Sequence, residues 1–391
     1  MPMNSIPDEE KYLIGIMSGT SADGINVAIV RESNSQLIDF YELPMPVELR
    51  EPILRLAQPG VNEIDAMGGL DRTLGEAFAN AARHAMHEAG IAPENVIAIG
   101  CHGQTIRHRP KGVEGGKPFT LQIGCAATIA EHTGITTISD FRSRDIAAGG
   151  EGAPLVPFAH HALFGTPEHP IAVLNIGGIA NITYLHHAAV TGFDTGPGNM
   201  VMDALMLAMT DGRHAYDADG DLAASGSINS ALLDKLLAHP YLKRSPPKST
   251  GRETFGQQIV DKIMAHPEIS DADRMATAAE LTARSIADSL QFLPQPPETW
   301  YLCGGGAYNL HLISRLEALL EPADVKSSGD LNIQPEAMEA LCFALLAKNT
   351  LLGVANTVPA VTGAAHAVVG GQITPGNNWH ETLQWIQSHT V

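Results

Sequence analysis

A short polar loop between two apolar segments is the first place where this sequence could bind a ligand. It reads MSGTSADGI, with YLIGI before it and NVAIV after it. Gly19 and Gly24 let the backbone approach a ligand closely, and the hydroxyls of Thr20 and Ser21 suit phosphate oxygens, while Asp23 could hold a metal ion through water. A plain glycine turn is the alternative, because the loop matches neither GxxxxGK[ST] nor GxGxxG.

A second glycine-rich turn lies in YLCGGGAYN, after another apolar run. Gly304, Gly305 and Gly306 would let a flat group such as a nucleobase lie against bare backbone, and Asn309 is suited to cap the next helix. A tight strand-to-helix turn accounts for the same residues without a ligand, so both interpretations stay open here.

Asp194 is the side chain best placed to accept a proton. It precedes the Gly-Pro-Gly turn in GFDTGPGNMVMD, and an aspartate held at such a turn can take a proton from water or a hydroxyl. The alternative is that Asp194 only caps the turn. Asn199 is predicted to cap the following helix, with Asp203 as a favourable first-turn acid.

Two further stretches are dense in hydrogen-bonding groups. CHGQT supplies His102, Gln104 and Thr105, and SDFRSRD supplies Arg142. Such a mixture suits a polyol or a sugar with a carboxylate, which an arginine would bind. A surface ion-pair network is the alternative.

The elements that must position these residues alternate between strands and helices, which predicts an α/β protein. The helices are expected at Asp65 to Glu88, at Asp271 to Leu290 after a Ser-Asp cap, and from Pro335 on. The strands are expected at Tyr12 to Met17, Asn26 to Val30, Leu37 to Tyr41, Val96 to Cys101, Ile135 to Ser139, Ile171 to Ile176, Ile182 to Leu185 and Trp300 to Cys303. YLIGIMSGTSADGINVAIV and IAVLNIGGIANITYL both read as strand, glycine turn, strand, which indicates a duplication.

The composition limits the classes of function. A chain of 391 residues predicts two domains, and a formal net charge of -19 without basic clusters disfavours nucleic acid as a partner. ATP is still compatible, since backbone amides can bind an anion. No run reads as a signal peptide or a membrane span, so a cytoplasmic protein with no membrane partner is expected. The four cysteines lack metal-binding spacing and are expected to be buried thiols.

Taken in order, MSGTSADG, CHGQT, SDFRSRD with GGEGAPLVP, NIGGIANIT, FDTGPGNMVMD, CGGGAYN, PEAMEALCFALLA and PAVTGA resemble the anhydro-N-acetylmuramic acid kinase family over roughly residues 12–371. The resemblance implies an α/β fold of two related actin/hexokinase-like (ribonuclease H-like) domains that flank an ATP cleft. The predicted domains are 1–168 and 169–364, with 365–391 packing back on the first. A homodimer is implied only by the resemblance.

The resemblance also implies the reaction and the residues that carry it. Water opens the 1,6-anhydro ring of 1,6-anhydro-N-acetylmuramic acid, and O6 takes the γ-phosphoryl group of ATP, with Mg2+, in peptidoglycan recycling. Asp194 is the expected base. ATP is expected to contact Gly19, Thr20, Ser21, Asp23, Gly24, Gly304, Gly305 and Gly306, and the sugar to contact His102, Gln104, Thr105, Arg142 and Glu336, although Glu336 could be only a first-turn acid. The metal ligands are not predicted.

Two positions depart from the family pattern. Cys125 stands where an acidic residue is usual after LQIG, and Glu151 stands where glutamine is usual. A kinase of another anhydro sugar, such as levoglucosan, is therefore the first alternative. An actin-like nucleotide switch without sugar chemistry is the second.

Overall fold

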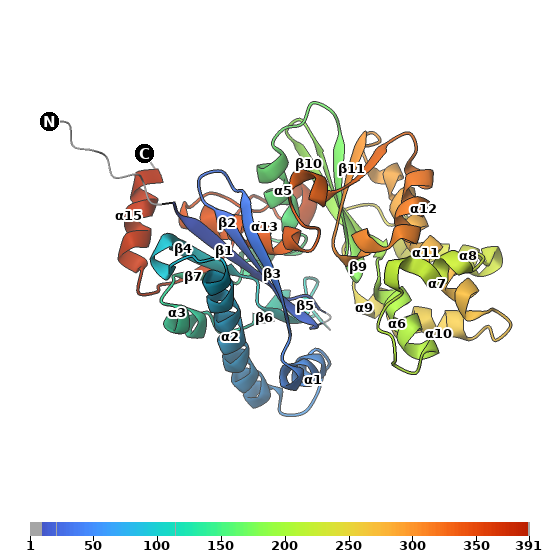
Figure 1. Ribbon diagram of the computed structural model, residues 1–391, viewed down its shortest axis with the longest axis horizontal. Coiled ribbons are helices and arrows are strands. Elements are labelled where there is room, and N and C mark those ends of the chain that lie inside the picture. Colours follow the sequence, from blue (N-terminus) through green and yellow to red (C-terminus); the bar gives the residue numbers. More distant parts are fainter. Residues whose placement is uncertain (1–9, 21, 114, 390–391) are drawn as a thin grey trace. The chain divides into compact units, whose positions relative to one another are not determined.

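The computed structural model describes residues 10–20, 22–113 and 115–389 (Figure 1). The described residues fall into two compact units. The first comprises those up to Leu163 together with those from Ala337 on, and the second is Phe164–Glu336.

The first unit is built on a six-stranded sheet in the order β13-β7-β4-β1-β2-β3. Strand β1 is antiparallel to β2, β2 to β3 and β7 to β13, whereas β1, β4 and β7 are parallel. The elements are β1 (Tyr12–Met17), β2 (Gly24–Arg31), β3 (Leu37–Pro44), α1 (Val47–Leu56), α2 (Glu63–Glu88), β4 (Val96–Cys101), β5 (Gln104–Arg109), β6 (Phe119–Ile123), α3 (Ala126–Thr133), β7 (Thr137–Ser139), α4 (Ser143–Ala147), α5 (Val156–Phe164), α13 (Ala337–Leu351), α14 (Pro359–Thr362), β13 (Gln372–Thr374) and α15 (Trp379–His389).

Helices α2 and α13 pack on opposite faces of this sheet. Ile14 and Ile16 of β1 belong to the apolar core under α2, and the alternation of a strand turns Gly15 to the other face. Gly15 pairs with Gly100 of β4, and a methyl group on either would lie 1.8 Å from Ala340 O or 2.2 Å from Phe343 O of α13. These two glycines therefore let α13 lie directly on the backbone of the sheet (Figure 1).

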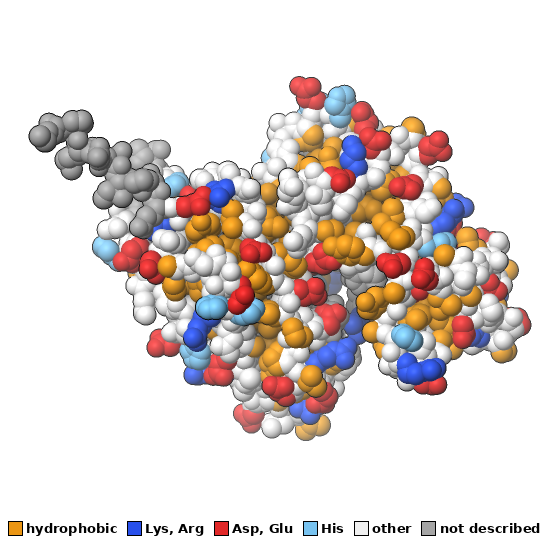
Figure 2. Space-filling model, viewed as in Figure 1, with side chains coloured by type: hydrophobic (Ala, Val, Ile, Leu, Met, Phe, Trp, Pro, Cys, Tyr) orange, Lys and Arg blue, Asp and Glu red, His pale blue; other side chains and the backbone are white. Residues whose placement is uncertain are grey.

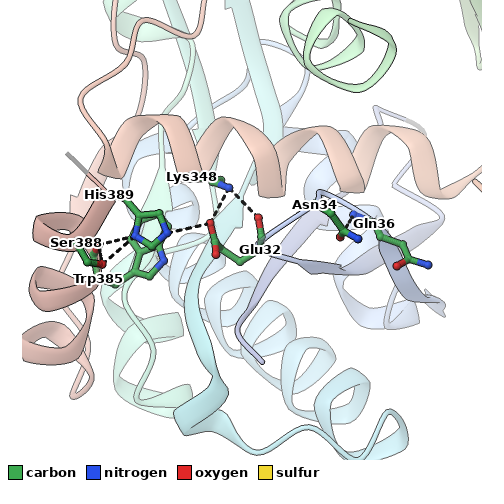
Figure 3. Close-up of polar contacts among 7 residues, drawn as sticks. All are labelled: Glu32, Asn34, Gln36, Lys348, Trp385, Ser388 and His389. Carbon is green, nitrogen blue, oxygen red and sulfur yellow. Dashed lines mark hydrogen bonds and ion pairs between the residues drawn. The ribbon is translucent and has the colours of Figure 1, made fainter. Parts of the chain in front are cut away.

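The end of the chain also packs on the first unit. Asn378 donates to the carbonyls of Val96 and Ile97 and accepts from the Thr136 amide at 2.8 Å. Lys348 of α13 lies 2.7 Å from the Glu32 carboxylate, and His389 of α15 lies 3.8 Å from the same group (Figure 3). The only basic residue of the apolar helix α13 is thus neutralised next to β2.

The second unit is built on a five-stranded sheet in the order β10-β9-β8-β11-β12. Strand β9 is antiparallel to β8 and β10, whereas β8, β11 and β12 are parallel. The elements are β8 (Ile171–Ile176), β9 (Ile179–His186), β10 (Ala189–Pro197), α6 (Met200–Met209), α7 (Asp221–Ser225), α8 (Ser230–Leu237), η3 (Pro240–Lys243), α9 (Arg252–Phe255), α10 (Gln257–Met264), α11 (Asp271–Ala287), η4 (Asp288–Phe292), β11 (Thr299–Cys303), η5 (Gly305–Tyr308), α12 (Leu310–Leu320) and β12 (Asp324–Ser327).

The two sheets share one topology. If β13 is left aside, the strand orders β3-β2-β1-β4-β7 and β10-β9-β8-β11-β12 match. In each sheet the first strand along the chain, β1 or β8, is central. The next two strands follow it on one side as an antiparallel meander, and two strands parallel to it lie on the other side. The predicted α/β fold of two related actin/hexokinase-like (ribonuclease H-like) halves is confirmed. The duplication indicated by the two glycine turns has this shared topology as its structural counterpart.

Several details differ from the sequence predictions. Strands β5, β6, β10, β12 and β13 were not predicted. The helix expected from Pro335 begins at Ala337, because the Pro335 carbonyl accepts from the Gly304 amide. Residues 337–364, assigned by prediction to the second domain, lie in the first compact unit, since α13 packs on β1, β2 and β4. The domain boundaries themselves stay a prediction.

The surface and the thiols complete the fold. On the face drawn in Figure 2, acidic side chains are spread among basic and apolar ones. Among the described residues, no helix is both long and apolar enough to cross a membrane. Cys101, Cys303 and Cys342 are buried as predicted, but Cys125 is partly exposed, so the prediction is wrong for this thiol.

Candidate functional site

In the first unit, one edge of the sheet gathers residues from three separate motifs. Strands β1, β4 and β7 are parallel, so their carboxyl ends lie at the same edge. Residues 18–23 follow β1, His102 follows β4, and Arg142 follows β7. This is the edge at which open α/β sheets bind their ligands.

The loop after β1 is tied to β5 by a buried glutamine. The Gln104 side chain is fully buried, accepts from the Ser18 hydroxyl at 2.8 Å and donates to the Gly19 carbonyl at 3.0 Å. Ser18 is also 2.9 Å from the Gly24 carbonyl, its alternative acceptor. Gln104 therefore acts as a brace that fixes the start of the loop.

The remaining loop residues present backbone and short side chains. Thr20 and Asp23 are exposed, and Gly24 is the first residue of β2. Ala22 is buried with a φ of 52°, a left-handed conformation that an alanine rarely adopts. Ser21, predicted to contact ATP, lies outside the described residues.

His102 and Arg142 form a fixed pair. Arg142 donates from Nε and a terminal nitrogen to His102 Nε2 at 3.1 and 2.9 Å, and to the Gly152 carbonyl at 2.7 Å. Because arginine only donates, His102 Nε2 must accept, so its Nδ1 carries the proton and donates to the Gly103 carbonyl at 2.9 Å. Burial, and then the charge of Arg142, hold the pKa of His102 well below its usual range. His102 is thus a neutral support for a cationic Arg142.

Glu339, at the start of α13, is a charged neighbour of Arg142 that the sequence analysis missed. Burial raises the pKa of the Glu339 carboxyl, and Arg142 opposes that rise. Glu339 stands three residues after Glu336 in PEAMEA, and its place in the first turn of an apolar helix was the only available signal. The pair places a cation and a carboxyl group of raised pKa at this edge of the sheet.

Thr105 belongs to a polar hairpin formed by β5 and β6. Its hydroxyl accepts from Gln122 at 3.2 Å, and Gln122 also donates to Thr120 at 2.8 Å. His108 lies 3.0 Å from the Thr120 hydroxyl, and burial, then the charges of Arg142 and Arg109, lower the pKa of His108 to about 4. The hairpin adds hydroxyl, amide and neutral imidazole groups to the first unit.

In the second unit, Asp194 lies near the carboxyl end of β10. This strand runs in the same direction as β8 and β11, because β9 is antiparallel to β8 and to β10. Asp194 is held on three sides: its amide donates to Lys248 O at 3.2 Å, its carbonyl accepts from the Tyr241 hydroxyl at 2.8 Å, and its Oδ2 accepts from the Thr250 amide at 2.8 Å. The carboxylate orientation is therefore fixed by backbone rather than by a flexible partner.

Lys248 lies beside Asp194 and was also missed. Its side chain is buried among three aromatic rings. Desolvation and then the charge of Arg244 lower the pKa of Lys248 to about 8, and Asp194 opposes the fall.

The three glycines after β11 differ in how much space surrounds them. A methyl group on Gly304 would lie 2.4 Å from Asn175 Oδ1, and one on Gly306 would lie 2.2 Å from Ile176 Cγ2. Gly305 is exposed, and the nearest atom to its added methyl group would be 3.9 Å away. Close packing requires the outer two glycines, and the middle one leaves bare backbone at the surface of the unit.

Three other predicted residues lie near this turn. Asn309 caps α12 as predicted, accepting from the Leu312 amide at 2.9 Å. Asn199 stands at the start of α6, but its side chain donates to Ile176 O at 3.3 Å and makes no cap, so that prediction is wrong. Glu336 accepts from the Tyr308 hydroxyl at 2.7 Å.

The structure thus brings the predicted residues together as two groups. The first unit holds Gly19, Thr20, Asp23, Gly24, His102, Gln104, Thr105 and Arg142, and the second holds Asp194, Gly304, Gly305, Gly306 and Glu336. In the part of the chain that the structure describes, no three His, Cys, Asp or Glu side chains gather where they could hold a metal ion. Mg2+ commonly takes one or two carboxylates and the phosphates of its substrate, and the exposed Asp23 fits such a role.

Comparison with known proteins gives a consistent result. The family model described as anhydro-N-acetylmuramic acid kinase matches residues 11–376. Curated proteins with that name from Shewanella loihica and Shewanella sediminis are both 44% identical, over 371 and 370 residues; each alignment covers 94% of this chain and 99% of the relative. Among solved structures, an activator of 2-hydroxyisocaproyl-CoA dehydratase from Clostridium difficile with bound ADPNP is similar at a TM-score of 0.43 and 11% identity, covering 86% of this chain and 94% of that one.

Proposed function

The chain belongs to the anhydro-N-acetylmuramic acid kinase family, and on that premise we propose that it converts 1,6-anhydro-N-acetylmuramic acid, water and ATP into N-acetylmuramic acid 6-phosphate and ADP. The single observation that carries the proposal is the 44% identity to curated kinases of that name over 94% of the chain. The reaction would return a cell-wall sugar to metabolism in peptidoglycan recycling.

Asp194 is proposed as the base for ring opening. Its carboxylate takes a proton from water as the water oxygen bonds to C1, and the bond from C1 to O6 breaks. A base in this role needs a fixed direction more than mobility. The bonds from Thr250, Lys248 and Tyr241 to Asp194 supply that constraint.

The freed O6 is proposed to attack the γ-phosphorus of ATP while the bond to the ADP oxygen breaks. Loop amides and the Thr20 hydroxyl would bind the phosphates, and the braced start of the loop helps to keep these donors in place. The exposed backbone at Gly305, with Gly304 and Gly306 beside it, would lie against the adenosine. Mg2+, held by Asp23 and the phosphates, supplies charge neutralisation when bound.

The polar groups at the edge of the first sheet are proposed to recognise the sugar. Arg142 would bind the lactyl carboxylate, since His102 and the Gly152 carbonyl already fix its guanidinium. We propose that Thr105 and Glu336 also contact the sugar, as the sequence predicted. Glu339 is proposed as a further sugar contact because it lies beside Arg142.

Two family departures bear on sugar preference. Cys125 precedes α3, and its amide donates to Asp71 O at 3.0 Å. Glu151 pairs with Lys111 at 3.3 Å, and its amide donates to Thr362 O at 2.7 Å. The Cys125 bond involves only the backbone and Glu151 is held by an ion pair, and we propose that the muramic substrate is retained.

The test is ADP release by the purified protein with ATP and Mg2+. Four conditions are compared: 1,6-anhydro-N-acetylmuramic acid, levoglucosan, N-acetylmuramic acid and no sugar. Turnover that depends on the anhydro-muramic sugar supports the proposal. Faster turnover with levoglucosan would make levoglucosan the proposed substrate in place of the anhydro-muramic sugar. ATP binding without sugar-dependent ADP release would favour a nucleotide switch.

Location and assembly are further proposals. Since ATP is the co-substrate, we expect the protein in the cytoplasm, and the family resemblance suggests a homodimer. Fractionation tests the first, and light scattering coupled to size exclusion tests the second.

A further inference from the structure

Lys248 is a buried cation that the reaction above does not use. Its side chain is only 2% exposed. The Nζ atom lies 4.5 Å from the ring centre of Phe292, 5.0 Å from that of Tyr241 and 5.5 Å from that of Phe193. An ammonium group that has lost water is attracted by the faces of such rings. The rings come from η4, η3 and β10, so the lysine connects three elements.

The backbone around Lys248 is bonded to Asp194. The Lys248 carbonyl accepts from the Asp194 amide at 3.2 Å, and two residues later the Thr250 amide donates to Asp194 Oδ2 at 2.8 Å. Tyr241, which contributes one of the rings, donates its hydroxyl to the Asp194 carbonyl at 2.8 Å. The segment that ends at Thr250 thus fixes both the backbone and the carboxylate of Asp194, and Lys248 anchors this segment.

The charges that act on Lys248 come from two residues. Arg244 repels the ammonium group, and Asp194 attracts it. Tyr241 is the titratable ring in contact with it. Burial and the charge of Arg244 lower the pKa of Lys248 to about 8, so the lysine is mostly protonated near pH 7. The attraction is mutual, so the cation favours the ionised form of the Asp194 carboxylate.

We propose that Lys248 is a positioning residue for Asp194. Its ammonium group holds the segment ending at Thr250 in place and keeps the carboxylate ionised for its work as a base. The inference rests on the proposed function, because it gives Asp194 the role of base.

The kinetic test uses Lys248→Met, which keeps the length of the side chain and removes its charge, and Lys248→Arg, which keeps the charge. Lys248→Met is expected to lower kcat about 10- to 100-fold, with the KM for ATP changed less than about threefold. The acid limb of its pH profile is expected at higher pH than in the unaltered enzyme. Lys248→Arg is expected to restore the acid limb and most of kcat. Lys235→Met, on the exposed side of α8, is the matched control and is expected to change nothing.

A second measurement needs no turnover. In enzyme labelled with 13C at lysine Cε, the resonance that disappears in Lys248→Arg is expected to titrate near pH 8, and at lower pH in Asp194→Asn. An unchanged titration in Asp194→Asn would overturn the charge coupling, even if Lys248→Met failed to fold.

The two proposals fail in different ways. Sugar-dependent ADP release by the unaltered enzyme, with the same kcat and acid limb in Lys248→Met, refutes only the role of Lys248. No sugar-dependent release by the unaltered enzyme refutes the proposed function and the positioning role with it.

Discussion

Replacing Gln104 by methionine would separate two roles for this side chain. Sequence analysis predicts that Gln104 contacts the sugar, whereas the structure has it fully buried as a brace between Ser18 and Gly19. Methionine has a similar size and cannot make either bond. The substitution therefore loosens the loop proposed to bind phosphates without emptying the site.

The size of the effect follows from the hydrogen bonds that remain. Without Gln104, the Ser18 hydroxyl can still donate to the Gly24 carbonyl at 2.9 Å, and Gly19 O still accepts from the Ala22 amide at 3.2 Å. No group is left without a partner, so the loss is two ordinary bonds, about 1–2 kcal/mol in total. If that cost falls on the conformation that binds ATP, the KM for ATP rises about 5- to 30-fold.

The assay is the initial rate of ADP release, measured against ATP at saturating sugar and against sugar at saturating ATP. Gln58→Met, at an exposed position of the same unit, is the control and is expected to leave both KM values unchanged. A higher KM for the sugar with an unchanged KM for ATP would refute the brace and restore the predicted sugar contact. No change in either would mean that the loop is held by other bonds.

Three other substitutions test the proposed base Asp194, the close packing of α13 on Gly15, and the buried imidazole of His160. Asp194→Asn is expected to lower kcat about 10²- to 10⁴-fold in the same ADP assay with ATP affinity unchanged, and near-normal turnover would remove Asp194 from the base role. Gly15→Ala places a methyl group 1.8 Å from Ala340 O and is expected to lower the free energy of unfolding in urea by about 3 kcal/mol or more, whereas Gly68→Ala, with open space around it, is expected to raise it by up to about 1 kcal/mol. Burial lowers the pKa of His160 to about 3, so the contribution of the neutral imidazole to stability is complete above about pH 6.5 and is lost as the pH falls toward 3. His160→Gln should therefore flatten the decline in the free energy of unfolding between pH 7 and 4.5. An equally steep decline in this variant would contradict the reasoning.

The sequence predicted the strands that are apolar on both faces, and the strands it missed carry polar or glycine-rich stretches. VIAIGC and IAVLNI are almost wholly buried, so their composition alone marks them as strands. QTIRHR of β5 is paired only with β6 in a two-stranded ribbon and carries polar side chains. In β10 the stretch TGFDTGP resembles a turn, yet its backbone pairs with β9 up to Pro197. Local composition cannot reveal a strand whose pairing partner accounts for its conformation.

The site shows the same limit at the level of single residues. Arg142 and Asp194 stand in distinctive motifs and were predicted. Lys248 lies in RSPPKST, which reads as an ordinary loop. Two of the three rings around its ammonium group, Phe193 and Phe292, come from elements that are distant in sequence. Glu339 becomes notable only when β7 brings Arg142 near the start of α13. Long-range packing creates these environments, and spacing along the chain does not encode them visibly.

The glycine turn after β1 and the turn at Gly177 and Gly178 after β8 look alike in sequence, but they differ in the structure. The first turn spans residues 18–23 between β1 and β2. Its start is braced by Gln104, and its Thr20 and Asp23 side chains are exposed at the surface of the unit. The second turn binds another segment of the same chain. The amides of Gly198, Asn199 and Met200 donate to the carbonyls of Gly177 and Gly178 at 2.8–3.2 Å. These bonds seat the start of α6, just after Asp194, on the turn. The shared topology thus holds one loop with exposed side chains, which we propose to bind phosphate, and one turn that supports the segment carrying Asp194, the proposed base.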